Sequence, residues 1–128
     1  MLPFRSRLTF EQRRLEYERI SVKRPEYVPT IVVRGSRDAP SIDKEKYLLP
    51  RELTGAQLSY VIRRRLRMQA TDALFLLCEG TTIPANKDMR QLYSEYADED
   101  GFMYITYTLE NAFGTVDRLS NELFTLVE

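Results

Sequence analysis

Six consecutive apolar residues, Ala73 to Cys78, restrict the ways in which this chain can fold. A run of this length without a polar break is typical of a strand that is buried on both faces. It is too short to cross a membrane, and nowhere does the chain hold the roughly eighteen apolar residues in succession that a spanning helix needs. We therefore expect segment 73–78 to be the central strand of a sheet.

Local patterns predict the elements around this strand. Two capping boxes, each a threonine followed three residues later by a glutamine, predict helices that begin after Thr9 and after Thr54. Helical spacing and β-branched or alternating residues predict the rest. In chain order we expect a helix over 10–22, strands over 28–34 and 46–49, a helix after Thr54, the strand over 73–78, a short helix over 89–96 and a strand over 103–108. This order indicates an α+β fold, a ubiquitin-like β-grasp with additional N-terminal helices.

The chain has no histidine and a single cysteine, Cys78. Histidine is the usual general base and the commonest metal ligand, and one cysteine forms neither an internal disulfide nor a zinc cluster. We therefore expect no catalytic residue, no metal and no cofactor, and a reducing, cytoplasmic compartment. Cys78 could act as a nucleophile, but a cysteine in an apolar run with no histidine to activate it is better interpreted as a buried hydrophobic residue.

Charges are segregated along a chain whose formal net charge is zero. Arginines and lysines crowd the first 24 residues, and an acidic cluster follows much later, so we expect one end of the molecule to be basic. The acidic cluster consists of Glu95, Asp98, Glu99 and Asp100. Four arginines, at positions 63, 64, 65 and 67, end the helix after Thr54. This arginine cluster could bind tubulin or nucleic acid, or it could be an ordinary solvated helix end favoured by the helix dipole; we expect no nucleic-acid partner.

Several segments resemble, in order, the autophagy ubiquitin-like modifiers, the group of the GABA-receptor-associated protein and the microtubule-associated protein light chains. The resembling segments are 10–14 (FEQRR), 18–20 (ERI), 28–32 (VPTIV), 42–50 (IDKEKYLLP), 61–66 (VIRRRL), 100–107 (DGFMYITY) and 110–114 (ENAFG). The resemblance covers roughly residues 4–114. We accordingly divide the chain into an N-terminal helical extension (1–24), a ubiquitin-like β-grasp domain (25–114) and a C-terminal tail (115–128) that is removed on maturation.

The resemblance implies that Gly114 is the end of the mature protein. In similar proteins a cysteine protease cuts after a glycine that follows an aromatic residue, so the processing site would be Phe113, Gly114 and Thr115. Enzymes like those that activate and conjugate ubiquitin would then join the exposed carboxylate to phosphatidylethanolamine. Glycine suits narrow enzyme clefts because it has no Cβ. Two alternatives stay open: Gly114 as a simple turn residue, and a retained tail helix formed by Val116, Leu119, Leu123 and Val127.

The resemblance also implies capture of short motifs in autophagy receptors, in which a branched aliphatic residue follows an aromatic one by three positions. Such a peptide would add as a strand to the edge over 46–49. One pocket would be lined by Glu16, Ile20, Pro29, Lys46, Leu48 and Phe102. The other would be lined by Tyr47, Leu49, Pro50, Leu53, Leu58, Val61 and Ile62. The cations that would attract acidic flanking residues are Lys44, Lys46 and Arg65, and Arg65 could also contact the processing protease.

Three features depart from the usual family pattern. Leu58 stands where the family usually has an aromatic residue, Tyr27 stands where it usually has a basic one, and the tail is longer than is typical. The resemblance implies a binding and tagging module that is not an enzyme, cytoplasmic when free and bound to autophagosome and vesicle membranes when lipidated. One alternative is an unconjugated adaptor that links receptors or microtubules to vesicles, and another is a small thiol enzyme that uses Cys78.

Overall fold

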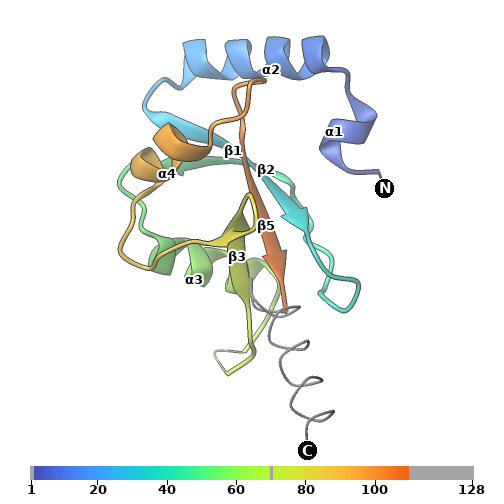
Figure 1. The fold of residues 1–128 in the computed structure, drawn as a ribbon, viewed down its shortest axis with the longest axis vertical. Coiled ribbons are helices and arrows are strands. Elements are labelled where there is room, and N and C mark those ends of the chain that lie inside the picture. Colours follow the sequence, from blue (N-terminus) through green and yellow to red (C-terminus); the bar gives the residue numbers. More distant parts are fainter. Residues whose placement is uncertain (1, 70, 110–128) are drawn as a thin grey trace, which may run out of the picture.

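A mixed five-stranded sheet with the strand order β2-β1-β5-β3-β4 carries helices on both faces (Figure 1). The computed structural model describes residues 2–69 and 71–109. The strands are β1 (Tyr27–Arg34), β2 (Lys46–Pro50), β3 (Phe75–Cys78), β4 (Thr81–Thr82) and β5 (Met103–Thr108), and the helices are α1 (Phe4–Arg7), α2 (Phe10–Lys23), α3 (Gly55–Arg65) and α4 (Met89–Tyr96). β1 and β5 run parallel, and the other neighbouring strands are antiparallel. The predicted α+β class with additional N-terminal helices is confirmed.

Three of the helices begin with a reciprocal capping box. Thr9 and Thr54 each accept a hydrogen bond from the backbone N–H of the glutamine three residues on, at 3.1 and 3.2 Å, and that glutamine's side chain accepts from the threonine N–H. Both boxes were expected from the sequence. The third, Asp88 with Gln91 at the start of α4, was not. These caps satisfy backbone donors that a helix start leaves unpaired, so they set where each helix begins.

The alternation of side chains along the strands divides the core into two parts. From β1, Val28 and Val32 join a large core beneath α3 and α4, whereas Ile31 lies in a smaller core beneath α1 and α2. Successive strand residues face opposite sides of a sheet, so one strand serves both cores. Other members of the large core include Leu49, Leu58, Ile62, Met89, Leu92, Ile105 and Tyr107, and the smaller core adds Phe4 and Phe102.

The expected central position of the apolar run 73–78 is wrong. β3 lies between β5 and the two-residue strand β4, and β5 occupies the middle of the sheet. Leu76 and Cys78 are buried, whereas Phe75 and Leu77 on the other face are only partly buried. The smaller core draws its strand residues from β1 and β5, so it does not extend under β3.

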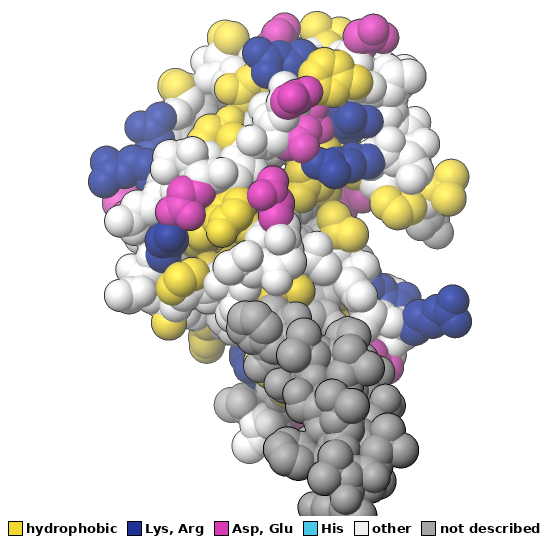
Figure 2. All heavy atoms as spheres, in the orientation of Figure 1, with side chains coloured by type: hydrophobic (Ala, Val, Ile, Leu, Met, Phe, Trp, Pro, Cys, Tyr) yellow, Lys and Arg dark blue, Asp and Glu magenta, His cyan; other side chains and the backbone are white. Residues whose placement is uncertain are grey.

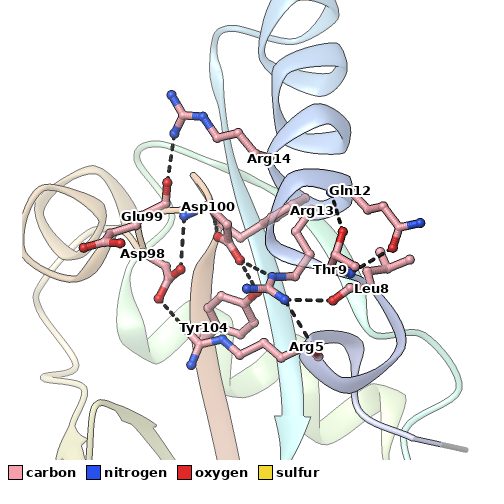
Figure 3. Close-up of polar contacts among 11 residues, drawn as sticks. Arg5, Leu8, Thr9, Gln12, Arg13, Arg14, Asp98, Glu99, Asp100 and Tyr104 are labelled. Atoms are coloured by element: carbon pink, nitrogen blue, oxygen red, sulfur yellow. Dashed lines mark hydrogen bonds and ion pairs between the residues drawn. The ribbon is translucent and has the colours of Figure 1, made fainter.

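The expected basic end of the molecule is found only in part, because the fold returns the acidic cluster to some of the N-terminal arginines. Arg5 pairs with Asp98, the Arg13 Nε lies 2.9 Å from a carboxylate oxygen of Asp100, and the Arg14 guanidinium donates to the Glu99 carbonyl at 3.0 Å (Figure 3). On the face shown in Figure 2, acidic and basic side chains lie intermixed over the upper part of the molecule. Some of the charges that are segregated in the sequence are therefore paired in the structure, whereas Arg19, Lys23 and Arg24 at the other end of α2 form no ion pair with a described residue.

The short helix α1 had no periodic signal, yet it anchors the N-terminus. Phe4 is 2% exposed, and its ring meets that of Phe102 edge to face at a centroid distance of 5.2 Å. Four residues are too few for a helical pattern to be recognised. Within the described residues no helix has the length and apolar character needed to traverse a lipid bilayer.

Candidate peptide-docking edge

The strand β2 forms one edge of the sheet and pairs only with β1 among the strands that the structure describes. The Val32 N–H donates to the Glu45 carbonyl at 2.7 Å, and the register places Lys46 opposite Ile31 and Leu48 opposite Pro29. Because hydrogen-bonded and non-hydrogen-bonded pairs alternate along an antiparallel ladder, the backbone groups of Lys46 and Leu48 point to the open edge. An extended peptide can add there as a further strand.

Pro29 fits this arrangement although it lies in an inner strand. It has no N–H to donate, and its partner Leu48 belongs to a non-hydrogen-bonded pair. On the other side of β1, the parallel ladder with β5 begins one residue later, where Thr30 lies opposite Met103. The missing donor therefore weakens neither ladder.

The residues expected to form the first pocket come together on the α2 side of the sheet. Glu16 and Ile20 project from α2, and Glu16 forms an ion pair with Lys46 of β2. Leu48 is 40% exposed, and Ile20 packs on the smaller core. Phe102 is fully buried beneath the rings of Phe4 and Tyr17, so it forms the floor under this surface.

The residues expected to form the second pocket lie on the α3 side. Leu53 and Val61 are partly buried and Pro50 is exposed. The remaining four, Tyr47, Leu49, Leu58 and Ile62, are buried in the large core. Val61 also lines a shallow hollow of about 350 Å³ with Tyr60, Arg64 and Arg65. Tyr60, which is 61% exposed, was not expected from the sequence, although its place beside the apolar positions of α3 could have indicated it.

Two of the expected cations meet at Tyr47. The Lys44 ammonium lies 5.7 Å from the centroid of the Tyr47 ring and the Arg65 guanidinium lies 5.9 Å from it. Arg65 also pairs with Asp43 at 3.2 Å. Burial raises the pKa of the Tyr47 phenol, and its buried hydroxyl has no hydrogen-bond partner among the described residues. Lys44 has no ion pair among the described residues, whereas Lys46 and Arg65 are paired with Glu16 and Asp43. An acidic peptide residue would therefore meet one unpaired cation here and two that already hold a carboxylate.

Two of the other arginines near the end of α3, Arg63 and Arg64, have local partners. The Arg63 guanidinium donates to the carbonyls of Gln69 and Asp72 at 3.2 and 2.6 Å, and that of Arg64 donates to the Tyr60 hydroxyl at 3.2 Å. The bonds of Arg63 tie the end of α3 to the segment that follows it.

Cys78 lies in the large core and is 1% exposed. Burial raises the pKa of its thiol from 9.0 to about 12, with smaller contributions from the carboxylates of Glu79 and Glu95. The thiol is therefore protonated near neutral pH, which argues against a nucleophile. The described residues also contain no group of three side chains that could hold a metal ion.

Phe113, Gly114, Thr115 and the tail helix predicted within 115–128 lie outside the described residues.

Comparison with known proteins gives a consistent result. The family model described as "Autophagy protein Atg8 ubiquitin like" matches residues 12–114. Autophagy-related protein 8c of Arabidopsis thaliana is 46% identical over 107 residues, which is 83% of this chain and 90% of that protein. Autophagy-related protein 8 of Kluyveromyces lactis is 42% identical over 120 residues, 93% of this chain and 97% of that protein. The solved structure of Plasmodium falciparum Atg8 in complex with a Plasmodium falciparum Atg3 peptide aligns with a TM-score of 0.79 at 25% identity and covers 87% of this chain and 98% of that one.

Proposed function

The chain belongs to the Atg8 family of autophagy ubiquitin-like proteins, and on this basis we propose that it is cut after Gly114 and joined through that residue to phosphatidylethanolamine, and that the β2 edge captures receptor motifs. Members of this family are ubiquitin-like modifiers and not enzymes. The family match carries the proposal because it covers most of the chain, and the matched range includes the whole of β2.

Two observations support Gly114 as the conjugated residue. The match to the family model ends at residue 114, which is this glycine. The last described strand, β5, ends at Thr108, so the glycine follows the sheet by a short segment of chain. A terminal glycine without a Cβ enters narrow protease and transferase clefts that a side chain would obstruct.

The mass of the intact protein recovered from starved cells tests this conjugation. We expect a species that ends at Gly114 and carries one phospholipid, and for Gly114→Ala we expect only the full-length chain. Because the altered residue lies beyond the sheet, Gly114→Ala should bind receptor peptides with unchanged affinity. If the natural chain keeps residues 115–128 under all nutrient conditions, the conjugation proposal fails and an unconjugated adaptor is the better description.

The open β2 edge supports peptide capture. Lys46 and Leu48 offer backbone groups to an added strand, and the apolar residues on either side offer places for an aromatic and an aliphatic anchor. The solved Plasmodium falciparum relative is in complex with a peptide of Atg3. This supports capture of peptides by the present chain, including peptides of its own conjugating-like enzyme. Burial of each anchor stabilises such a complex by about 1.5–3 kcal/mol, which suits affinities on the order of micromolar after ordering costs.

The substitution Leu48→Ala tests the edge. We expect it to weaken a synthetic peptide with an acidic flank and an aromatic-x-x-aliphatic motif by about fivefold to thirtyfold, because about 1–2 kcal/mol of apolar contact is lost. Leu15→Ala is the matched control, since Leu15 is also a half-exposed leucine but lies on α2. Titration calorimetry measures both, and equal affinities for the two variants would refute the assignment of this edge.

A further inference from the structure

A pocket of about 340 Å³ opens where the end of α2, the start of β1, the turn after β2 and α4 meet. Figure 1 shows the end of α2 turning into β1 above α4. Three arginines and three tyrosines are among its lining residues: Arg24, Arg51, Arg90, Tyr17, Tyr27 and Tyr93. Of its lining residues, Pro29 alone was also assigned to a receptor-motif pocket, and none was assigned to conjugation.

Hydrogen bonds to backbone carbonyls hold together the three chain segments that carry these arginines. The Arg51 guanidinium donates to the Pro25 carbonyl at 2.7 Å, and the Arg90 N–H donates to the Arg51 carbonyl at 3.1 Å. The Tyr27 N–H donates to the Arg24 carbonyl at 3.2 Å. The turn that follows α2, the turn that follows β2 and the start of α4 are thereby held against one another.

The positive charge of this pocket is not neutralised within the part of the chain that the structure describes. None of Arg24, Arg51 and Arg90 forms an ion pair with a described residue, and no acidic residue lines the pocket. The hollow beside α1 differs, because both Arg34 and Glu45 are among its lining residues. A concave surface lined by one sign of charge concentrates ions of the other sign.

We propose that this pocket binds a phosphate monoester attached to a small ring. The planar guanidinium groups of three arginines match the oxygens of a phosphate dianion and can bind it in pairs of parallel hydrogen bonds. The volume exceeds that of a phosphate group alone and approaches that of ordinary small-ligand sites. The tyrosine rings provide the apolar surface against which the ring of the ester packs.

Three of the hydroxyl groups that line the pocket already donate hydrogen bonds to carbonyls of the protein. The Tyr93 hydroxyl already donates to the Gly101 carbonyl at 2.6 Å, and burial raises the pKa of its phenol, so its ring stays neutral and fixed in place. The hydroxyls of Ser21 and Ser94 donate to carbonyls of their own helices at 3.1 and 2.7 Å. Because these three hydroxyls are already engaged, we assign the phosphate to the arginines.

The pocket and the end of β5 lie at opposite ends of β1. The pocket lies at Tyr27, where β1 begins, whereas β5 ends beside Arg34 at the other end of β1. At roughly 3.3 Å per residue, these two ends of the sheet are about 23 Å apart. Two soluble sources share the required chemistry, a free nucleotide or sugar phosphate and a phosphotyrosine side chain. The inference depends neither on conjugation through Gly114 nor on motif capture at β2.

Titration of the full chain with phenyl phosphate, followed by amide NMR, tests the proposal. We expect saturable shifts at the amides of residues 24–28 and 90–94, and none with phenol at the same concentrations. Arg24→Gln and Arg90→Gln should each weaken binding at least tenfold, because a charge-assisted hydrogen bond is lost. Arg51 is not substituted, because its guanidinium also donates a hydrogen bond to the Pro25 carbonyl. Arg19→Gln, on the same helix but outside the pocket, is the matched control and should bind as the natural chain does.

Two further ligands identify the source. Tighter binding of adenosine monophosphate than of phosphotyrosine amide supports a soluble nucleotide, and the reverse order supports a phosphorylated protein. Equal affinity of phenyl phosphate for the natural chain and for the double variant Arg24→Gln/Arg90→Gln would overturn the proposal. So would shifts centred on the arginine cluster over 63–67, or the absence of saturation at any position.

Discussion

The carboxylate of Asp100 fastens the N-terminal helices to the β-grasp domain. It is fully buried and accepts hydrogen bonds from the Arg13 Nε at 2.9 Å, from the Phe102 N–H at 2.9 Å and from the Tyr104 hydroxyl (Figure 3). The Arg13 guanidinium also donates to the Leu8 carbonyl at 2.8 Å. One buried carboxylate thus connects the start of β5 with both N-terminal helices.

The substitution Asp100→Asn keeps the shape of this side chain and removes its charge. The amide of asparagine has a single acceptor oxygen, so it cannot satisfy all three donors, and Arg13 is left with its charge largely buried and unpaired. Loss of one partner of a buried pair costs about 3–5 kcal/mol, and since the Arg13 side chain retains 13% exposure we expect a loss of about 3 kcal/mol in the free energy of unfolding.

The neighbouring pair of Arg5 and Asp98 supplies a matched control. These side chains are 52% and 29% exposed, so Asp98→Asn should cost less than about 1 kcal/mol. Urea unfolding followed by circular dichroism measures both variants, and the double variant Arg13→Gln/Asp100→Asn measures the coupling between the two groups. Hydrogen exchange should also show faster opening of α2 in Asp100→Asn. Equal destabilisation by Asp98→Asn and Asp100→Asn would refute this account of the buried carboxylate.

Three further changes test other parts of the fold. Gly101 has φ +97°, and a Cβ there would lie 2.2 Å from the Tyr17 ring, so Gly101→Ala should lower the free energy of unfolding by more than about 2 kcal/mol. Gly80→Ala, with φ +79° and open space around it, should lower it by only about 1–2 kcal/mol. Equal losses for the two variants would contradict the packing of Gly101 against Tyr17. Thr54→Ala should cost about 1 kcal/mol by urea unfolding, since α3 loses a cap, and no loss would argue against that cap. The pKa of Cys78 rises from 9.0 when unfolded to about 12 when folded, so the unfolded chain ionises first and the free energy of unfolding falls as the pH rises from about 9 to about 12. Cys78→Ala should remove this part of the pH dependence, and iodoacetamide at pH 8 should label the folded thiol about a thousandfold more slowly than the unfolded one; rapid labelling would revive a reactive cysteine.

Elements with short-range signals were predicted well. The capping boxes at Thr9 and Thr54 start α2 and α3 as expected, and the expected strand over 28–34 differs from β1 by one residue. A capping box or an alternating strand is visible in sequence because its partners lie within a few residues of one another. The apolar run 73–78 contains the expected strand over its last four residues, but its place in the sheet was predicted wrongly, since apolar composition does not reveal which strands become its neighbours.

The candidate site was predicted in part. The resemblance placed the docking edge over 46–49, and the structure shows β2 as an open edge strand with Leu48 exposed. The resemblance did not indicate that Phe4 covers Phe102. The helix α1 is too short to leave a pattern in the sequence, and the contact between these two rings depends on the path of the whole chain.

The sequence alone determined the α+β class, the starts of the helices and the absence of histidine chemistry, because each of these depends on composition or on neighbours within a turn of the chain. The pairing of Arg13 with Asp100 joins residues 87 positions apart, and the basic pocket gathers Arg24, Arg51 and Arg90 from three segments. Charge and polarity act through space, so whether an aspartate is a solvated surface group or a buried anchor is decided only when the chain has folded and excluded water around it.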